Sequence, residues 1–568
     1  MSLFSVMNVA NKALFASQLG LSVTGHNMSN AEVRGYSRQR IDLSADYHRN
    51  PRFGQVGFGV DVLGISRIRN EYIDAQIRRQ SHELGKNYVI AQTLESAENI
   101  LNEPADNTGI LEFMNKFFGE WENLTNNPAD RAARTAVKNS AEMLTDVFHT
   151  VSSELQKLRE DKNDEIFSLV GKINTIASEL FNLNGEISIV ELGGNSANDS
   201  KDRRDQLMRE LSEIVDFDYH TDKDGQVTIS VSGHILVSPV GFNKLEVYDD
   251  RGYDDEKYEY HRYGVRTANG KNTIIPKSGE LKGLMVARDE LIPKYEAEIN
   301  QLAKVFVETI NEVHRSGYSL RGYSGVNFFD PTCLDAKTMK LSAEILTNVD
   351  NIAAAKGGSK QKADTNLILA GGLAYGNPPV NLSKLGGAPW TTGDPTSNKA
   401  INITFGTVVV TVNGTNNKLI EDTDYKIDYV NGTIQMLNTA YDTTALDIDF
   451  EYRTSDFPGI GNNENAIEMC ELRKKLTMRS SLFGEPTATF DQYYGSIIAE
   501  LGLDSKDALA EVRTRAFLIE QYDDHQDSIA GVSLDEEMSN LVKYQYTYQA
   551  AARIFTTAQA MLDILLNL

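Results

Sequence analysis

Apolar side chains recur at helical spacing at both ends of the chain. Near the N-terminus the steps alternate between four and three residues, which predicts a helical seam. The positions of this seam are Leu3, Met7, Ala10, Leu14, Ser17 and Leu21. Near the C-terminus an apolar row repeats every seven residues, at Leu534, Leu541, Tyr548, Phe555 and Leu562. The sequence therefore predicts a coiled-coil-like helix at each end.

The C-terminal helix has a companion row of mixed character, at Met538, Gln545, Ala552, Gln559 and Leu566. Two interpretations of its glutamines stay open. Either they set the register of a helix pair, or the whole row faces a different neighbour.

The middle of the chain alternates between extended and helical patterns. Glycine-rich alternation over Gly57–Ile65 predicts a strand or ribbon. A long apolar stripe after Pro128 predicts an unbroken helix over 129–191, and a shorter helix follows near 202–215. Asp224-Gly225 predicts a hairpin turn between two strands, and the helical pattern returns over 280–314.

A second extended region is predicted further along. Residues 357–397 are rich in Gly, Pro, Asn, Ser and Thr and are interpreted as a linker. Residues 401–452 then alternate with a period of two, and Asn413-Gly414 and Asn431-Gly432 supply turns. We interpret this region as an all-β module inserted in a helical chain. Helix is predicted again over 464–475 and from about 504 to the end.

These elements predict a multidomain α+β protein. Paired N- and C-terminal coiled-coil-like helices are joined to an elongated helical-bundle domain with small β elements, and an all-β domain is inserted into it. We expect residues 1–45 with 530–568 to form the terminal helical core. Residues 46–356 with 457–529 form the elongated helical domain, and 357–456 form the inserted all-β domain.

The composition of the two ends adds to this picture. All 13 prolines lie between Pro51 and Pro486, so neither end contains the strongest helix breaker. Charged side chains are scarce there: Lys12 is the only one up to Ala31, and Asp563 is the only one after Arg553. Exposed helices usually carry a charged face. Both terminal helices are therefore predicted to be covered on several faces.

The overall charge excludes two classes of partner. The chain carries 80 acidic and 56 basic side chains, for a net charge of −24. Nucleic acid and anionic membranes both select for Lys and Arg. The sequence also contains no apolar run of the length that spans a bilayer. We therefore expect no nucleic-acid partner and no membrane insertion.

Motifs for catalysis or metal binding are missing from the sequence. It contains no P-loop, HExxH or GxSxG pattern. Cys333 and Cys470 form no CxxC pair, and whether they form a disulfide stays open. The segment 220–231 fails as a calcium loop because Val231 stands where glutamate is needed, and His26 is interpreted as a hydrogen-bonded loop histidine. We predict no catalytic residue, no metal site, no cofactor and no enzymatic activity.

Several segments, taken in order, resemble the flagellar rod, hook and hook-associated proteins. Asn27, Asn30 and Gly35-Tyr36-Ser37-Arg38 match the N-terminal signature of that family. Glu32-Val-Arg34 departs from it, because the family usually has Asn-Thr-Pro there. The other matching segments are 57–67, 198–207, 531–538, 544–553 and 561–568. The internal and C-terminal segments resemble the hook-associated branch, which acts at the hook–filament junction.

The resemblance implies a function and a set of partners. It implies a structural subunit of a helical ring whose terminal helices line the central export channel. The implied partners are copies of the chain, the hook protein, the next hook-associated protein and a cytoplasmic export chaperone at the C-terminal helix. The implied location is the flagellum, external or periplasmic, reached without a cleaved signal peptide. The expected assembly interface is Leu3, Met7, Leu14, Leu21, Asn27, Asn30, Gly35, Tyr36, Leu534, Met538, Leu541, Tyr548, Phe555, Leu562 and Leu566.

Two other hypotheses are considered. The chain is a sibling axial protein, such as a hook or rod protein, or it is an axial protein whose β insertion binds a carbohydrate or host ligand. An enzyme in the insertion is disfavoured, because 401–452 contains neither His nor Cys. We further expect both terminal helices to be largely disordered in the free monomer, since alone they bury little surface.

Overall fold

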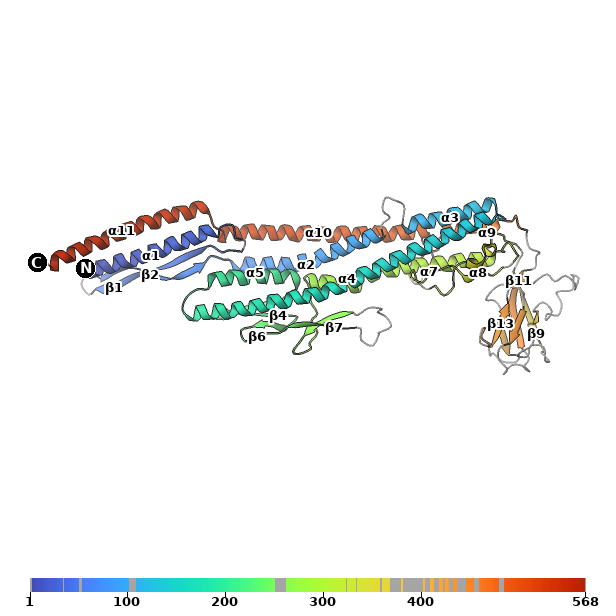
Figure 1. Cartoon of the computed structure of the whole chain (residues 1–568), viewed down its shortest axis with the longest axis horizontal. Coiled ribbons are helices and arrows are strands. Elements are labelled where there is room, and N and C mark those ends of the chain that lie inside the picture. The colour runs from blue at the N-terminus through green and yellow to red at the C-terminus, as the bar shows by residue number, and fades with distance from the viewer. Residues whose placement is uncertain are drawn as a thin grey trace. The chain divides into compact units, whose positions relative to one another are not determined.

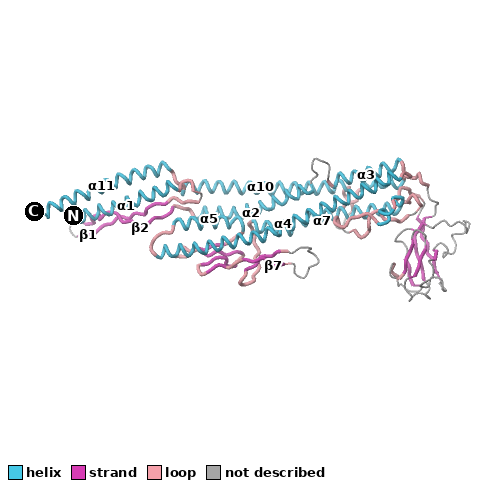
Figure 2. Tube along the Cα trace, viewed as in Figure 1, coloured by secondary structure: helices cyan, strands magenta, loops and turns pink. Residues whose placement is uncertain are grey.

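A computed structural model gives the fold of the chain. It describes residues 3–357 except 34, 51–53, 102–108, 251–261, 323 and 334, and residues 459–566 except 480–484. Between these ranges it describes only the strands named below and residues 418–421 and 424. Helices predominate, and the sheets are small and antiparallel (Figure 2).

Contacts within the chain group it into two compact units. Unit 1 comprises Met1–Glu95, Arg159–Leu291 and Asp504–Leu568, and unit 2 comprises Ser96–Leu158 and Ile292–Leu503. This grouping does not coincide with the three parts expected from the sequence, so that division stays a prediction. The two units are described separately below.

The ends of the chain meet in unit 1. Helix α1 (Leu3–Ser29) packs along helix α11 (Leu534–Leu566), as predicted (Figure 1). A two-stranded antiparallel ribbon of β1 (Gln39–Asn50) and β2 (Gly54–Arg67) lies against α1. This ribbon contains the extended segment predicted at Gly57–Ile65. Coiled-coil geometry for the helix pair stays a prediction.

Four further long helices contribute residues to unit 1, and three of them also contribute to unit 2. The single helix expected over 129–191 is confirmed, whereas the helix expected from about 202 begins four residues earlier. These helices are α2 (Glu71–Leu101), α4 (Arg131–Leu192), α5 (Asn198–Ile214) and α10 (Phe490–Ala530).

Two small sheets complete unit 1. The predicted hairpin at Asp224-Gly225 is confirmed, and Gly225 has a φ of 73°, which favours glycine. The first sheet has the order β3-β4-β5-β6, and the second pairs β7 with β8. The strands are β3 (Asp218–Thr221), β4 (Val227–Val231), β5 (His234–Ser238), β6 (Gly241–Phe242), β7 (Leu245–Asp249) and β8 (Tyr263–Thr267).

The helix predicted over 280–314 is interrupted. It consists of α6 (Glu280–Val286), a π-helical turn (Ala287–Leu291) and α7 (Ile292–Ser316), of which α7 belongs to unit 2. Pro293 lacks the N–H that an α-helix needs there, which favours a wider turn just before it.

The core of unit 1 is built from α4, α5 and β4. Each contributes apolar residues at its own period, three to four along the helices and two along the strand. The central members are Ile166, Val170, Ile173, Leu180, Leu207, Leu211, Val227, Ile229 and Val231. Burying each of these side chains contributes roughly 1.5–3 kcal/mol to folding.

Unit 2 has an aromatic core. Phe117 and Trp121 of α3 (Ile110–Asn126) pack against Phe328, and Phe117 also packs against Phe306 of α7. Short helices α8 (Ala343–Thr347) and α9 (Glu464–Glu471) and 3-10 turns at Val349–Asn351 and Leu472–Lys474 complete the helical part. The helix predicted over 464–475 is thus shorter than expected.

Strands occur in the region predicted to be extended, and two also occur in the predicted linker, at 360–367 and 380–381. Residues 360–367 form β9, which pairs along its whole length with β15, so the linker interpretation is wrong there. Ladder hydrogen bonds with a neighbouring strand outweigh the low strand propensity of a polar sequence. The turns predicted at 413–414 and 431–432 lie outside the described residues.

The strands form two antiparallel sheets, β10-β14-β13 and β11-β15-β12 with β9 on β15. They are β9 (Lys360–Leu367), β10 (Val380–Asn381), β11 (Asn402–Ile403), β12 (Val409–Val412), β13 (Tyr425–Asp428), β14 (Thr433–Met436) and β15 (Leu446–Arg453).

Candidate functional site

The pairing of α1 with α11 is antiparallel and close. Asn27, near the end of α1, contacts Glu537 near the start of α11. Gly20, seven residues before Asn27, contacts Tyr544, seven residues after Glu537. A Cβ at Gly20 would lie 2.6 Å from the Tyr544 ring, so this spacing of the helices requires glycine. Small side chains form most of the buried face of α1, namely Ala10, Ala16, Ser17, Val23 and Thr24.

The packed face of α11 follows steps of four and three residues. The buried or half-buried positions that follow these steps are Glu537, Leu541, Tyr544, Ala551, Phe555, Ala558 and Leu562, and Asn540 and Ala552 beside them are also half-buried. Leu541, Phe555 and Leu562 of the predicted heptad row therefore lie in this seam. Tyr548 is in register with them but 41% exposed, and Leu534 is 50% exposed.

Most of the companion row of α11 lies off this seam, although Ala552 is half-buried. Met538 is 56% exposed, and Gln545 and Gln559 are also exposed, so the glutamines do not set the register between α1 and α11. The second row of the seam runs instead through Tyr544, Ala551 and Ala558. The sequence prediction missed this row because it relied on large apolar side chains. Alanines are small, but they let two helices approach closely. The side chain of Leu566 lies outside the described residues.

The remaining predicted positions of α1 are half-buried, and its C-terminal end differs from expectation. Leu3, Met7, Leu14 and Leu21 keep part of their surface exposed.

The segment around His26 was expected to be a loop, but α1 continues to Ser29. Ser29 Oγ donates to Gly25 O at 2.8 Å and Asn30 Nδ2 donates to His26 O at 3.0 Å, which satisfies carbonyls of the last turn.

Asn27 fixes the turn that follows α1. Its Oδ1 accepts hydrogen bonds from Gln39 N at 2.9 Å and from Tyr36 Oη at 2.8 Å. Its Nδ2 donates to Gln39 O at 2.9 Å and to Glu537 Oε2 at 3.2 Å. The buried amide thus uses its full bonding capacity. One side chain therefore joins α1, the ribbon and α11.

Gly35 and Tyr36 shape the same turn. Gly35 has a φ of 87°, which favours glycine, and Tyr36 N donates to Val33 O at 3.1 Å. The Tyr36 hydroxyl also lies 3.1 Å from His26 Nδ1, so this histidine has a partner. Burial, followed by the charges of Asp199, Asp202 and Glu537, raises the pKa of Tyr36, which keeps the phenol neutral.

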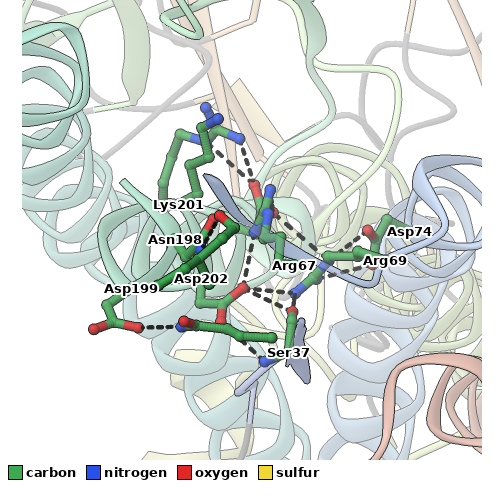
Figure 3. A network of polar contacts seen from close by, with 12 residues as sticks. Ser37, Arg67, Arg69, Asp74, Asn198, Asp199, Lys201 and Asp202 are labelled. Atoms are coloured by element: carbon green, nitrogen blue, oxygen red, sulfur yellow. Dashed lines mark hydrogen bonds and ion pairs between the residues drawn. The ribbon is translucent and has the colours of Figure 1, made fainter. Parts of the chain in front are cut away.

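Asp202 of α5 holds the turn to the body of unit 1 (Figure 3). Its Oδ2 accepts from Ser37 N at 2.9 Å, and its Oδ1 accepts from Ser37 Oγ at 2.7 Å and from Arg67 Nη1 at 2.8 Å. Neighbouring residues extend the contact: Gln39 Nε2 donates to Asp199 Oδ1 at 2.8 Å, and Asn198 Nδ2 donates to Ile65 O at 2.9 Å. The first turn of α5 therefore binds both the turn and the ribbon.

Half-buried arginines balance the carboxylates of this junction. Arg67 Nη2 lies 2.8 Å from Asp205, and Arg69 makes two hydrogen bonds to Asp74 at 2.6 and 2.9 Å. Burial alone would raise the pKa of Asp205, but Arg204, Arg67 and Arg69 outweigh it and hold that pKa below its ordinary value. For Arg69, burial is outweighed by Asp74 and its neighbours, and the pKa is raised. Asp205 and Arg69 therefore remain ionised at neutral pH.

Arg38 connects the turn to the start of α11. Its Nε donates to Glu537 Oε1 and its Nη1 donates to Glu536 Oε2, each at 2.8 Å. Its backbone N–H donates to Ala530 O at the end of α10, at 3.0 Å. Burial lowers the pKa of Arg38, but the bonds to Glu536 and Glu537 outweigh it and the net shift is upward. These contacts set where α11 begins.

Four segments of the sequence thus meet at one polar junction, which we define as Asn27, Tyr36–Gln39, Arg67, Arg69, Asp74, Asn198–Asp205 and Glu536–Glu537. Sequence reasoning singled out Asn27, Asn30, Gly35 and Tyr36 but missed the charged members. The available signal was charge complementarity: Arg38 and Arg67 are cationic, whereas the segments 198–207 and 531–538 contain carboxylates. Periodicity alone could not show that they meet.

The described residues offer little chemistry beyond packing and ion pairing. They contain no group of three His, Cys, Asp or Glu placed to hold a metal ion, and no helix of the length and hydropathy needed to cross a membrane. The segment 220–231 is a hairpin in which Asp222 accepts from Asp224 N and Gln226 N. Cys333 and Cys470 are both free thiols, which answers the open question of their pairing.

Comparisons with known proteins agree with this arrangement. Residues 94–329 match the family model described as the flagellar hook-associated protein FlgK helical domain, and residues 527–568 match the flagellar basal body rod FlgEFG protein C-terminal model. The flagellar hook-associated protein 1 of Bacillus subtilis is 25% identical over 100% of this chain and 98% of its own length. That of Salmonella typhimurium is 28% identical over 99% of this chain and 100% of its own length.

Over almost its whole length this chain is similar to flagellar hook-associated protein 1, and its helical region matches the FlgK helical-domain model. The matched C-terminal segment contains the start of α11 and all of its packed face. The helical-domain match contains α5 and therefore Asp202 and Asp205. Two segments of the polar junction, Asn198–Asp205 and Glu536–Glu537, therefore lie within residues that the family models match.

A solved structure supports the fold. The hook junction protein FlgK from Burkholderia pseudomallei superposes with a TM-score of 0.55 at 15% sequence identity, covering 80% of this chain and 100% of that chain. At this identity the likeness concerns the fold alone.

Proposed function

We propose that this chain is a structural subunit that joins hook to filament in a bacterial flagellum, and that its copies form a helical ring around the central export channel. The observation that carries this proposal is the apolar surface that α1 and α11 leave uncovered after they pair. Phe4, Phe15, Met538, Val542, Tyr546, Ile554, Met561 and Ile564 are between 46% and 70% exposed. Burial of such a surface against other subunits is favourable.

The partners follow from a position at a junction. Copies of the chain cover the exposed faces of the terminal helices, and coiled-coil packing extends from the α1–α11 pair to its neighbours. The hook protein contacts the ring on one side, and the next hook-associated protein contacts it on the other. Before assembly, a cytoplasmic export chaperone covers the apolar face of α11.

Location and domain roles complete the proposal. The chain is exported to the flagellum, external or periplasmic, without a cleaved signal peptide. Residues 357–456 form an inserted all-β domain, and no catalytic role is assigned to any part of the chain. The interface includes Asn30, Gly35 and the other positions expected from the sequence.

The experiment compares two kinds of α11 variant, each expressed in a strain that lacks the chromosomal gene for this chain. Phe555→Asp places a carboxylate in the α1–α11 seam, whereas Ile554→Asp, at the adjacent residue, places one on the exposed face of α11. Both variants should reduce the amount of chain in purified flagella at least tenfold, since each buries a charge when subunits assemble. Ser539→Asp, on an exposed polar position of the same helix, is the control.

The amount of each variant in purified flagella is measured by immunoblot, and motility is scored in parallel. The thermal unfolding midpoint of each purified monomer shows whether the two units still fold. This midpoint should be the same as that of the unchanged chain. Normal incorporation of both Phe555→Asp and Ile554→Asp would contradict the proposal. The same preparations distinguish this role from that of a sibling axial protein. We ask whether the chain co-purifies with hooks that carry no filament and with hook–filament particles. A hook or rod protein would not be confined to the junction.

A further inference from the structure

A basic groove of unit 1 is not used by the polar junction. Its volume is about 1,120 Å³, and α2, β3 and residues 273–277 contribute to its lining. The cationic side chains that line it are Arg78, Arg79 and Lys277. Phe217, Tyr219 and Ile275 supply an apolar part, and Ile275 is 69% exposed.

Arg78 is the unusual member of this groove. It is 7% exposed, its guanidinium lies 4.6 Å from the centre of the Tyr219 ring, and Nη2 donates to Tyr219 Oη at 2.7 Å. Its Nε is buried without a hydrogen-bond partner, and no described carboxylate lies within ion-pair distance of it. Buried charges in proteins are normally paired. The guanidinium therefore lacks the negative partner that its burial calls for.

The other charges of the groove leave it with surplus cations. Arg79 and Lys277 are exposed, and neither forms an ion pair with a described residue. Asp216 is occupied, because its Oδ1 accepts from the backbone N–H groups of Lys277 and Ser278. Asp218 is the remaining lining carboxylate. Three unpaired cations in one place, in a chain of net charge −24, indicate an acidic partner.

An acidic ridge with matching features lies on α10. Glu520, Asp524 and Asp527 are spaced by four and three residues, so they share a face, and all three are exposed. No described cation pairs with them. Phe517, one turn earlier on that side, is 57% exposed. Burial and the neighbouring charges of Asp523 and Asp524 raise the pKa of Asp527, which is what a crowded set of carboxylates produces.

Helix α2 separates the ridge-bearing helix from the groove. Ile73 and Ile77 of α2 pack against Ile519 and Tyr522 of α10. Successive helix residues are turned by about 100°, so Arg78 and Arg79 point away from the face that carries these isoleucines. The groove and α10 therefore lie on different faces of α2. Complementary patches on different faces are what a head-to-tail contact requires, and such contacts form rings or helical assemblies.

We propose that the groove receives the acidic ridge of a neighbouring copy of this chain. Asp524 and Asp527 of one copy pair with Arg79 and Lys277 of the next, and Phe517 packs against the apolar part of the groove. This proposal rests on the proposed function, because it names a surface by which copies of the subunit contact one another. It places the contact in the body of unit 1, separate from the terminal helices.

Charge reversal tests this pairing. Arg79→Glu and Asp524→Lys are exposed substitutions, and each alone should lower the amount of chain in purified flagella at least tenfold, since like charges then face each other. The double variant should recover to within about threefold of the unchanged chain. Lys223→Glu, an exposed reversal in the β3–β4 turn outside the groove, should incorporate normally. If the single variants incorporate normally, or the double variant is no better than the worse single one, the proposal is wrong.

Crosslinking gives a direct readout. Arg79→Cys and Asp524→Cys are combined in a chain whose Cys333 and Cys470 are replaced by alanine, and purified flagella are treated with a mild oxidant. A ladder of dimers, trimers and larger adducts of this chain is expected, because each copy carries both halves of the contact. Adducts that stop at the dimer, adducts with another protein, or no adducts would overturn the proposal. The proposed function fails separately, if the unchanged chain is not found at the hook–filament junction.

Discussion

The ring of Tyr544 lies directly over the backbone of Gly20, and this contact sets the distance between the two terminal helices. A Cβ at Gly20 would be 2.6 Å from the ring and 2.7 Å from two further ring atoms. The ring belongs to a half-buried side chain in the middle of the seam, so it has little room to move aside. Packing of this kind fixes the register of α1 on α11 as well as their separation.

Substitution of this glycine should therefore separate the helices. Gly20→Val is expected to reduce incorporation into flagella at least tenfold, because the helices must move apart by a side-chain layer. Gly25→Val is the matched control in the same helix, since nothing lies within 4 Å of a Cβ there. Incorporation is measured by immunoblot of purified flagella. Equal effects of the two substitutions would show that helix propensity, and not the contact with Tyr544, is responsible.

The polar junction should be sensitive at Asp202. Asp202→Ala removes the acceptor of two hydrogen bonds from Ser37 and one from Arg67, and it leaves part of the half-buried Arg67 guanidinium unpaired. We expect the free energy of unfolding of the chain to fall by about 3 kcal/mol. Urea denaturation followed by circular dichroism measures this. Arg203→Ala, an exposed change on the next residue of α5, should cost less than about 1 kcal/mol, and a similar loss in both variants would contradict the role of Asp202.

Unit 2 should lose stability as the pH falls, through His314. Burial, assisted by Arg134, lowers the pKa of His314 to about 4, although a hydrogen bond from Nδ1 to Val326 O opposes the shift. The unfolded chain has a histidine pKa near 6.5, so below that pH it binds a proton that the folded chain excludes. The free energy of unfolding should fall by about 2 kcal/mol between pH 7 and pH 5 from this group alone.

A substitution separates this histidine from other titrating groups. His314→Asn keeps a polar side chain in the site but cannot titrate. The difference in unfolding free energy between this variant and the unchanged chain, measured in urea at pH 7 and pH 5, should shrink by about 2 kcal/mol at the lower pH. A difference that is the same at both pH values would show that His314 does not titrate in this way.

The terminal helices should be the least protected part of the free monomer. Alone, α1 and α11 bury only one face each, and the remaining apolar surface gives no stabilisation until subunits assemble. Limited proteolysis should first remove residues on the far side of the polar junction, before about 27 and after about 537. Mass spectrometry of early fragments gives the cut sites. Resistance of both ends, with first cuts in the body of either unit, would contradict the expectation.

Much of the helical fold could be predicted from the sequence, because its periodic patterns are long. The stripe after Pro128 predicted α4 to within two residues at the N-terminal end and one at the C-terminal end. The Asp224-Gly225 turn predicted the β3–β4 hairpin, because a positive φ at Gly225 suits that geometry. Strand β9 was missed, since its polar residues carry no alternating pattern and only its pairing with β15 makes it a strand.

The site was predicted less completely, for a physical reason. The heptad row through Leu541 and Phe555 located one edge of the seam, but the other edge is made of Ala551 and Ala558, which periodicity of large apolar residues does not detect. The polar junction depends on contacts such as Arg38 with Glu537, which are 499 residues apart. Charge pairs at that separation follow from the tertiary fold and have no local signature.

The location of the chain in the flagellum tests the central claim most directly. Purified hook–filament particles are labelled with an antibody against this chain and imaged by electron microscopy. A single band of label at the hook–filament junction is predicted, with no label along the hook or the filament. Label distributed along the hook, the rod or the filament, or its absence from these particles, would contradict the claim.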